Sequence, residues 1–479
     1  MDSTRSMARH FSCNGGNRMA KIILRSLTPF HLGTGNTYSY LECYVMEKTL
    51  YRINQIATAR KFRNSPDASL FRKYMDALGN RSISDINRNQ RAVFYYLKKG
   101  VALYHMPFYG QRVHLSGNYA IRECLKQRTR DQEPPLKPYI PGSTVKGFLR
   151  TAILWDCIKN KPEFTVEVHG KKITMNLEDV LINGYKRRSG QSRQYVVKGL
   201  KQLKTAPPEK RQYIYHYLAQ EMERLVFFTG SISGFSSFNK MKNNRLFDLL
   251  KFLLVSDFSP RNDFDLHVDN VITFSTRRGG RAVAIDDRNL LEACAGTFVG
   301  EIQLSPQVAT VLNNKNYHNL ECKLPLIGID DDVDIFNDAW ETIENAMFNH
   351  LQEIATNFMR EAIRSEKRYL HVTCPHPELV TAREKEFGAG KIGFMRLGYG
   401  IGARYRSLLL NLLERNCEEY WHVIEDITPH IRHSCYKHPR ASHSIIIPPF
   451  PRTYKLLQHR KQPLGWFSWE TEIQENITL

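Results

Sequence analysis

The segment Tyr139–Leu154, with the sequence YIPGSTVKGFLRTAIL, most strongly constrains how this chain folds. Pro141 ends an extended stretch, Gly142 permits a tight turn, and Ser143 is a favourable helix N-cap. Apolar residues then recur at helical spacing, so we expect a helix that runs to about Ile158. The segment predicts a strand, a turn and a helix in direct succession.

The start of this helix offers a site for an anion. Its first backbone N–H groups have no intrahelical acceptor, and the helix dipole adds partial positive charge there. Lys146 and Arg150 lie one turn apart on an exposed face and contribute two cations. The pattern is not a P-loop, because the lysine precedes Gly147 and no hydroxyl follows it to hold Mg²⁺. An ordinary capped helix with solvated charges is the alternative.

A second glycine-rich segment, FGAGKIGFMRLGYGIGARYRSLL, lies near the C-terminus and is interleaved with basic residues. Alternate glycines let a backbone pass close to a ligand chain, arginines contact phosphates without regard to sequence, and tyrosines stack bases. It is not a dinucleotide-binding fingerprint, because the glycine order differs and no βαβ unit surrounds it. The candidate RNA-binding residues here are Arg396, Arg404, Arg406, Gly398, Gly400 and Gly402.

The composition indicates a protein that binds a polyanion. The 479 residues include 68 Lys and Arg against 48 Asp and Glu, which gives a formal charge of +20. Such an excess repels itself unless an anionic partner neutralises it, and nucleic acid is the expected partner. No stretch reaches the ~20 apolar residues of a membrane span, so we expect no membrane partner and a cytoplasmic protein. The nine cysteines form no C-x-x-C pair and are expected to be reduced thiols.

The length of the chain favours two domains. We expect a disordered tail over 1–18, an N-terminal module over 19–260 with basic and helical insertions, and a C-terminal module over 261–479 that carries the glycine-rich loop. The stretch KIILRSL predicts a strand, FHLGTG a glycine loop, and TYSYLECYVM a second strand.

Later segments show clearer periodicity. Residues 214–225 have apolar positions at helical spacing, and Leu246–Leu254 also predicts a helix. Thr297–Leu304 alternates as a half-buried strand does. A long amphipathic helix is expected from DDDVDIF onward, with one apolar stripe made of Phe336, Trp340, Ile343, Met347, Leu351, Ile354 and Phe358.

Metal sites and catalytic residues have weak sequence support. Asp330, Asp332, Asp334 and Glu341 follow calcium-loop spacing, but Ile335 replaces the required glycine, so these acids better serve the dipole of the following helix. The histidine and cysteine groups lack a zinc spacing and are expected at the surface; they are His371, Cys374, His376, His430, His433, Cys435 and His438.

His31, beside the first glycine loop, is the one candidate for acid–base chemistry. A histidine poised against a phosphate can act as the base of a metal-independent ribonuclease. No second catalytic partner can be identified in the sequence, and an ordinary loop histidine is the alternative. We therefore expect no metal, no cofactor and no small-molecule substrate.

Three of these segments resemble one family. LTPFHLGTG resembles the N-terminal strand and loop of the RAMP superfamily of CRISPR-associated proteins, YIPGSTVKGFLRTAIL its IPGSSLKGALR signature, and FMRLGYGIGARYRSLL its C-terminal glycine-rich loop. LLVSDFSP and FPRTYKLLQHRKQPLGWFSWE are similar to segments of the fifth Csm subunit of type III-A interference complexes. The matches span residues from about 22 to 470.

The resemblance implies an α+β fold of tandem ferredoxin-like, RRM-like RAMP modules with helical insertions. It also implies a non-catalytic subunit that caps the backbone filament at the 3′ side of the CRISPR RNA, contacts a neighbouring Csm backbone subunit and other Csm proteins, and supports guide maturation and antiviral defence. In the family's backbone subunits an acid after the first glycine loop cleaves target RNA. Here Glu42 is the only acid in that region, and the aspartate pattern is absent.

The sequence therefore predicts a subunit that binds the guide by its sugar-phosphate backbone, with no enzymatic activity. Two alternatives remain: a metal-independent RAMP endoribonuclease with His31 as base, and a nucleotide-binding enzyme that uses the glycine stretch. Besides the C-terminal arginines and glycines, the predicted RNA-binding residues are Ser143, Lys146, Arg150, Gly33, Gly35 and His31.

Overall fold

The computed structural model gives an α+β protein and describes most of the chain between residues 21 and 472. The described residues are 21–38, 42–64, 69, 72, 102–110, 120–128, 136–161, 163–168, 171–189, 192–197, 199–203, 214–230, 247–261, 264–276, 282–314, 316–330, 332–373, 393–401, 405, 411, 453–459 and 461–472. The predicted disordered tail over 1–18 lies outside them.

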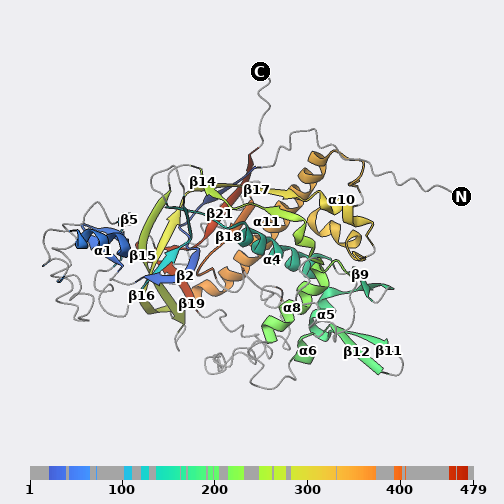
Figure 1. Cartoon of the computed structure of the whole chain (residues 1–479). Coiled ribbons are helices and arrows are strands. Elements are labelled where there is room, and N and C mark those ends of the chain that lie inside the picture. The colour runs from blue at the N-terminus through green and yellow to red at the C-terminus, as the bar shows by residue number, and fades with distance from the viewer. Residues whose placement is uncertain are drawn as a thin grey trace, which may run out of the picture.

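One six-stranded antiparallel sheet lies in the middle of the molecule (Figure 1). Its strands run in the order β13–β17–β1–β21–β18, and the short β14 also pairs with β17. Strands from the beginning, the middle and the end of the chain therefore meet in one sheet. Their bounds are β1 Lys21–Ser26, β13 Leu253–Val255, β14 Ser259–Pro260, β17 Thr297–Leu304, β18 Gly393–Arg396 and β21 Trp466–Glu472.

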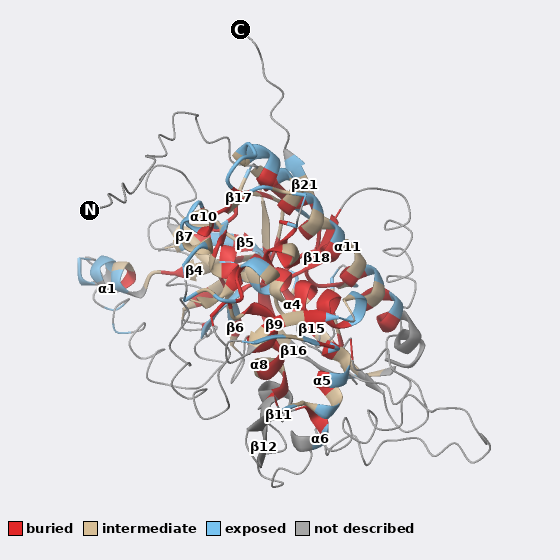
Figure 2. Ribbon diagram, turned by 90° about the vertical axis from the view of Figure 1, so that its right-hand side faces the viewer, coloured by how far each residue is buried: buried red, intermediate tan, exposed pale blue. Residues whose placement is uncertain are grey.

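Two long helices, α4 (Gly142–Asn160) and α11 (Trp340–Thr373), pack against each other beside this sheet. Phe148 and Trp155 of α4 meet Phe358 of α11 edge to face, with ring centroids 5.8 and 5.7 Å apart. Such contacts bury large aromatic area in the main core. Figure 2 shows buried residues concentrated on α4, α8 and the central strands, whereas α1 is mostly exposed.

A second six-stranded sheet has the order β2–β6–β16–β15–β19–β20. In the chain, its long β15–β16 hairpin lies between β14 and β17, two strands that pair with each other in the first sheet. β6 pairs with β16 in parallel. A three-stranded sheet, β3–β4–β5, packs on it through a separate apolar cluster. The bounds are β2 Gly33–Tyr38, β6 Ile121–Cys124, β15 Asp265–Thr276, β16 Ala282–Ala295, β19 Thr453–Leu457, β20 Gln462–Pro463, β3 Cys43–Met46, β4 Thr49–Ile53 and β5 Ala102–Pro107.

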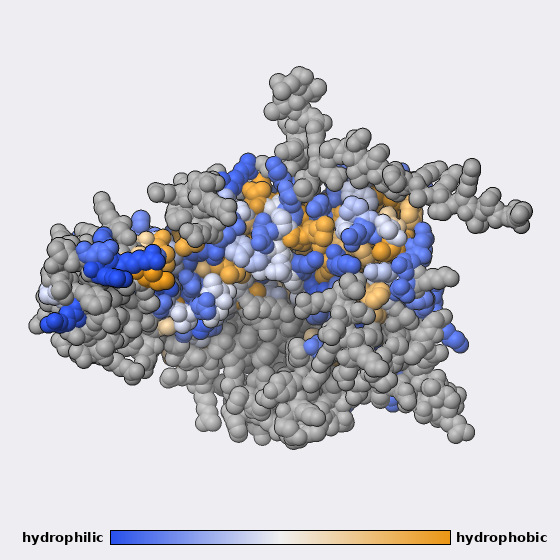
Figure 3. Space-filling view, in the orientation of Figure 1, coloured by the Kyte–Doolittle hydropathy of each residue, from blue (hydrophilic) through white to orange (hydrophobic). Residues whose placement is uncertain are grey.

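The remaining described elements are short helices and hairpins. In Figure 3, the hydrophilic group at the left belongs to α1, whose last turn carries Arg60, Lys61 and Arg63. The bounds are α1 Gln55–Arg63, α5 Leu177–Asn183, α6 Leu200–Leu203, α8 Ile214–Phe227, α10 Gln307–Leu312, the 3₁₀ helices η4 Leu249–Lys251 and η5 Glu321–Ile327, and the strands β7 Lys126–Arg128, β8 Leu136–Pro138, β9 Phe164–Val168, β10 Lys171–Met175, β11 Tyr185–Ser189 and β12 Ser192–Val197.

Several sequence predictions are confirmed. α8 occupies the periodic segment, α4 covers the predicted helix, and β17 has the predicted bounds with alternating burial. The stripe of α11 is buried from Ile343 to Phe358. Phe336, however, precedes the helix and is 48% exposed, so its assignment to that stripe is wrong.

Other predictions are wrong for identifiable reasons. Leu246–Leu254 does not form the predicted helix over its described part, because Asp248 caps a single 3₁₀ turn, η4, and β13 then pairs with β17. The predicted glycine loop after His31 is instead part of strand β2: Gly33 pairs with Cys124 of β6, and Gly35, at φ +88°, lies in the irregularity before Thr37. Ser143 is not the cap of α4: Pro141 takes that position and makes no side-chain cap bond.

The expected domain boundary also differs from the observed sheets. β1, β13 and β14 precede residue 261 and β17, β18 and β21 follow it, yet all six strands belong to one sheet. A division at 260 therefore separates hydrogen-bonded strands, and the described structure does not consist of two consecutive modules. The reason is topological, since sheet strands are recruited from distant parts of the chain.

A candidate nucleic-acid interface

Three of the segments singled out in the sequence meet around one cavity of about 530 Å³. The strand β2 and the residues before it form one side, α4 forms another, and the C-terminal glycine segment forms a third. The lining residues are His31, Leu32, Gly33, Gly35, Asn36, Arg122, Thr144, Gly147, Phe148, Thr151, Arg396, Leu397, Gly398, Tyr399, Ile401 and Tyr405.

Two glycines allow close backbone contacts of the C-terminal glycine segment, one with the residues before β2 and one with the residue before β21. The Tyr399 N–H donates to the His31 carbonyl at 2.8 Å, and a Cβ on Gly398, at φ +97°, would lie 2.6 Å from that oxygen. Gly465, at φ +80°, receives a hydrogen bond from the Leu397 N–H at 2.8 Å, and a Cβ there would lie 2.0 Å from the Leu397 carbonyl. Any other residue at these positions would be strained and would push the segments apart.

The wall contributed by α4 consists of Thr144, Gly147 and Thr151, which share one face of the helix. A Cβ on Gly147 would meet no atom within 4 Å, so this position opens on the cavity. Gly142 is required for another reason, since a Cβ there would lie 2.2 Å from the carbonyl oxygen of Val255. The Pro-Gly-Ser turn therefore lets the helix start against the end of β13.

The amino end of α4 already has an anionic partner. The Gly142 N–H donates to Asp257 Oδ1 at 2.9 Å. Asp257 belongs to the stretch LLVSDFSP, whose resemblance was noted in the sequence but whose physical role the sequence did not reveal. The prediction that the first amides of α4 are free for a phosphate is thus wrong for the Gly142 N–H, because a carboxylate accepts from it.

Lys146 and Arg150 lie on a different face of α4 and do not line the cavity. Arg150 forms an ion pair with Asp248 at 2.5 Å and lies 3.6 Å from Glu223, with its guanidinium 4.5 Å above the Phe227 ring. Partial burial lowers the pKa of Lys146, and the Asp248 carboxylate opposes this shift. Both cations thus interact with Asp248, and Arg150 also contacts α8. Ser143 is exposed at the start of the helix.

Arg396 lines the cavity but is only 1% exposed. Its guanidinium binds both carboxylate oxygens of Glu366 at 3.0 and 3.2 Å and the Leu464 carbonyl at 3.2 Å. Burial disfavours its charge, but Glu366, Tyr405 and Tyr454 together outweigh this effect and raise the pKa of Arg396. The Tyr405 hydroxyl donates to the same carboxylate at 2.6 Å. Arg404, Arg406 and Gly402 lie outside the described residues.

Two cations near the Tyr399 ring, exposed Arg122 and half-buried Lys455, were not singled out in the sequence. Arg122, on β6, is exposed and lies 5.1 Å from the centre of the Tyr399 ring. Lys455 donates to the Tyr399 hydroxyl at 2.7 Å from β19. Among the described residues Arg122 has no ion-pair partner, so its charge is available to a phosphate. No local pattern marks these residues, since they reach the site through strand pairing.

His31 is only 3% exposed, and its ring is fixed. Nδ1 donates to the Glu292 carbonyl at 2.8 Å, and the ring meets Tyr399 edge to face with centroids 5.9 Å apart. Burial lowers the pKa of His31, and Arg122 and Lys126 act in the same direction, whereas Glu292 opposes them. The imidazole is therefore neutral near pH 7.

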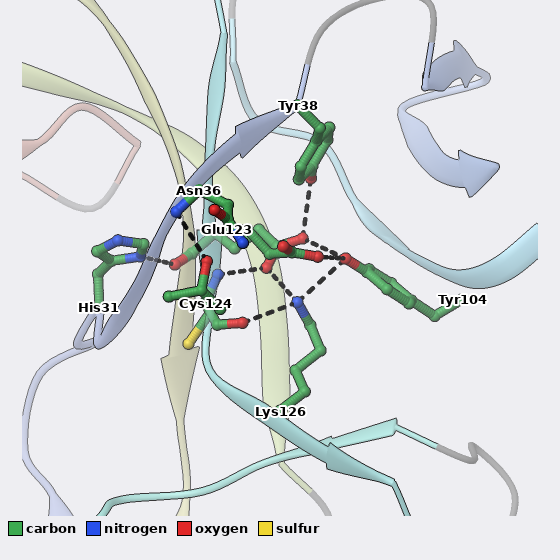
Figure 4. A network of polar contacts seen from close by, with 9 residues as sticks. His31, Asn36, Tyr38, Tyr104, Glu123, Cys124 and Lys126 are labelled. Carbon is green, nitrogen blue, oxygen red and sulfur yellow. Dashed lines mark hydrogen bonds and ion pairs between the residues drawn. The ribbon is translucent and has the colours of Figure 1, made fainter. Parts of the chain in front are cut away.

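A buried network beneath β2 holds this side of the cavity in place (Figure 4). The Glu292 carboxylate is fully buried and accepts from the Tyr38 hydroxyl at 2.9 Å, the Tyr104 hydroxyl at 2.8 Å and the Cys124 N–H at 2.7 Å, and it pairs with Lys126. One carboxylate thereby joins β2, β5, β6, β7 and β16. The same residue supplies the carbonyl that orients His31.

The other candidate sites have structural partners. Glu42 pairs with Arg52 at 3.2 Å and does not line the cavity. Asp334 accepts from the Phe336 N–H at 2.8 Å in a turn that precedes α11, and of the four acids only Glu341 lies in the first turn of that helix. Within the described residues, no group of three or more His, Cys, Asp or Glu side chains is placed to hold a metal ion. The histidine and cysteine group from Cys374 onward lies outside them.

No helix in the described part of the chain has the length and apolarity needed to cross a membrane. The fold and the cavity define a mixed α+β protein whose glycine-containing segments converge on a cleft with a cationic rim. A model of the RAMP superfamily matches residues 23–301, more than half of the chain, and the chain therefore belongs to that superfamily. The resemblance noted in the sequence is confirmed.

Two solved structures have a similar fold over almost the whole chain. One is a chain of a Csm–crRNA–target RNA ternary complex of a type III-A CRISPR–Cas system, with a TM-score of 0.57, 16% identity, and coverage of 94% of this chain and 100% of that chain. The other is T. onnurineus Csm5, with a TM-score of 0.51, 16% identity, and coverage of 93% and 99%. No curated protein matches the sequence.

Proposed function

We propose that this chain is a non-catalytic subunit of a type III-A CRISPR ribonucleoprotein that binds the guide RNA by its sugar-phosphate backbone. It would cap the backbone filament at the 3′ side of the guide, contact a neighbouring Csm subunit and support guide maturation. Membership of the RAMP superfamily and the fold shared with Csm5 and with a chain of a Csm–crRNA complex support this role.

The observation that carries the proposal is the meeting of three family-like segments at one cavity. Its rim has the exposed guanidinium of Arg122, while its walls offer hydroxyls and glycine backbone but no carboxylate. Such a surface recognises phosphate and ribose rather than base edges, which suits a subunit that must accept guides of any sequence. Of the glycines predicted from the sequence, Gly33, Gly35 and Gly398 line the cavity, whereas Gly400 does not; Arg122 is an addition that the sequence did not predict.

We further propose that β1, α4, β13, β17, α11 and β21 form one ferredoxin-like unit. The strand order β13–β17–β1–β21, with a helix after the first and third strands in chain order, is that of a βαββαβ module. The second sheet would then be built from segments that interrupt this unit at several points, with only its β15–β16 hairpin lying between β14 and β17, rather than from a module that follows in tandem.

Purification from cells that express a CRISPR array tests the function. The chain should retain short RNAs with a common repeat-derived end, and its affinity for unrelated RNAs of equal length should be similar and fall steeply with salt. Arg364→Gln, at an exposed position of α11, serves as the control that leaves binding unchanged. A chain that carries no RNA and whose affinity ignores salt would contradict the proposal.

The ribonuclease alternative has one observation in its favour, because the neutral imidazole of His31 borders the cavity. A base also needs an acid for the leaving oxygen, and the described cavity residues provide no second histidine or carboxylate. Incubation with repeat RNA in EDTA separates the two functions. Cleavage that is lost in His31→Ala would replace the binding role with an enzymatic one.

A further inference from the structure

The orientation of His31 determines which hydrogen bond it offers to a ligand. The Glu292 carbonyl can only accept, so Nδ1 must carry the proton in the 2.8 Å bond between them. In the neutral ring Nε2 then bears a lone pair and can only accept. The structure thus fixes the tautomer as well as the position of the ring.

Nε2 is placed to use that lone pair. Among the described residues it has no hydrogen-bond partner, yet it is not one of the side-chain atoms that are sealed from solvent. His31 is 3% exposed, and the side of its ring that solvent can reach borders the cavity. Gly33 leaves room for this atom, because a Cβ there would lie 2.9 Å from Nε2.

The groups around the ring keep it neutral. Burial is the largest effect and lowers the pKa of His31, and the cations Arg122 and Lys126 lower it further, against the opposing effect of Glu292. A neutral acceptor cannot bind a phosphate oxygen, which has no proton to donate at pH 7. Its complement on a nucleic acid is a hydroxyl, and the ribose 2′-hydroxyl is the group that distinguishes RNA from DNA.

We propose that His31 Nε2 accepts a hydrogen bond from the 2′-hydroxyl of one bound nucleotide, so that the cavity selects RNA over DNA. This inference rests on the proposed function, since it assigns the ligand chemistry of the same cavity. Arg122 would hold the strand by charge, and His31 would read the sugar. The role is one of recognition and requires no bond to be broken.

A series of singly modified RNAs tests this contact on the intact chain. Each strand carries 2′-fluorine at one nucleotide, which removes the proton donor while leaving the phosphates unchanged. At one position the affinity should fall by about 3- to 10-fold, the size of one net hydrogen bond, and the other positions should have little effect. An all-DNA strand of the same sequence should bind more weakly than the RNA.

His31→Asn removes the distal acceptor but retains an amide donor for the Glu292 carbonyl. In this variant the modified and unmodified strands should bind equally, whereas His105→Asn, at an exposed position on β5, should preserve the difference. If His31 has a purely structural role, His31→Asn will weaken binding of both strands by the same factor. That result would overturn the inference. The wild-type series decides the question even if His31→Asn impairs folding.

The two proposals fail in different ways. A wild-type chain that binds RNA with steep salt dependence but is indifferent to every 2′-fluorine contradicts the sugar contact alone. A wild-type chain that binds neither RNA nor DNA contradicts the proposed function itself.

Discussion

The two faces of α4 differ in whether neighbouring residues occupy them. Thr144, Gly147 and Thr151 face the cavity, and a Cβ on Gly147 would meet no atom within 4 Å. On the other face, Arg150 lies 2.5 Å from Asp248 and stacks on Phe227. The face with the cations is closed by ion pairs, whereas the face without charge is open to a ligand.

The same contrast separates the arginines around the cavity. Arg396 is buried against Glu366, and Arg150 is held by two carboxylates, but Arg122 is exposed. A cation contributes to binding only if its protein partners leave its charge available. The position of an arginine in a glycine-rich motif is therefore weaker evidence of RNA contact than its exposure in the fold.

Replacement of Arg396 by alanine should have the largest effect on this comparison. It leaves the Glu366 carboxylate buried without its cation, which costs about 3–5 kcal/mol of the free energy of unfolding. Urea unfolding measures this loss. If Arg396 were instead an RNA contact, Arg396→Ala would unfold at the wild-type urea concentration and lose only RNA affinity.

A double variant sharpens the same point. Arg396→Met combined with Glu366→Leu removes both charges and keeps similar volume, so it should recover much of the stability lost by Arg396→Ala. Failure to recover would mean that the hydrogen bond to Leu464 and the Tyr405 hydroxyl, rather than the ion pair, stabilise this part of the core.

Lys323 extends the contrast to a buried cation that donates to backbone carbonyls and forms no ion pair with a carboxylate among the described residues. Its Nζ donates to the carbonyls of Leu225 and Phe228 at 2.7 and 2.5 Å, at the end of α8, and burial lowers its pKa to about 7. Between pH 7 and 10.5 the unfolded chain holds the proton more tightly than the folded chain. The free energy of unfolding should therefore rise with pH, by about 1 kcal/mol from pH 7 to about pH 8.

Chemical unfolding at several pH values checks this slope. Lys323→Met should flatten it, whereas Lys159→Met, at a partly exposed lysine, should leave it unchanged. Measurements belong below about pH 8.5, because the buried thiols of Cys43, Cys124 and Cys157 have a raised pKa of about 12 and oppose the trend once unfolded thiols ionise. A slope that is the same in wild type and Lys323→Met contradicts the assignment.

The sequence predicted those parts of the fold that depend on local pattern. Alternation defines β17, and helical spacing with a Pro-Gly turn defines α4. The helix predicted over 246–254 is wrong because pairing of β13 with β17 overrides the helical pattern. The boundary expected at residue 260 divides a sheet, because local periodicity does not determine which distant strands pair.

The site was predicted to the same extent. Glycine and proline patterns located the three segments that surround the cavity, since such patterns report local backbone demands. They did not reveal which cations face it, because the partner of Arg150 is Asp248 and the partner of Arg396 is Glu366, both distant in sequence. Arg122 reaches the rim only because β6 pairs with β2.

Paired neutral substitutions compare an available cation with an occupied one. Arg122→Gln should weaken RNA binding several-fold for unrelated sequences and reduce the slope of log affinity against log salt by about one. Arg150→Gln should leave this slope unchanged and lower stability by about 1 kcal/mol, the size of a partly exposed ion pair. Fluorescence anisotropy at several salt concentrations measures both. Equal slopes for the two variants would erase the distinction between the available charge of Arg122 and the ion-paired charge of Arg150.

Gly147→Ala should produce the smallest effect and the most specific one. Alanine in place of a helix-interior glycine stabilises by about 0.5–1 kcal/mol, and here the new methyl group meets no protein atom within 4 Å. Gly147→Leu gains a similar helix preference but extends a larger side chain into the cavity. If the cavity holds the RNA strand, thermal unfolding will show both variants to be at least as stable as wild type, while RNA affinity falls only in Gly147→Leu. Unchanged affinity in Gly147→Leu would show that the strand passes elsewhere, because the open face of α4 would then be filled without consequence.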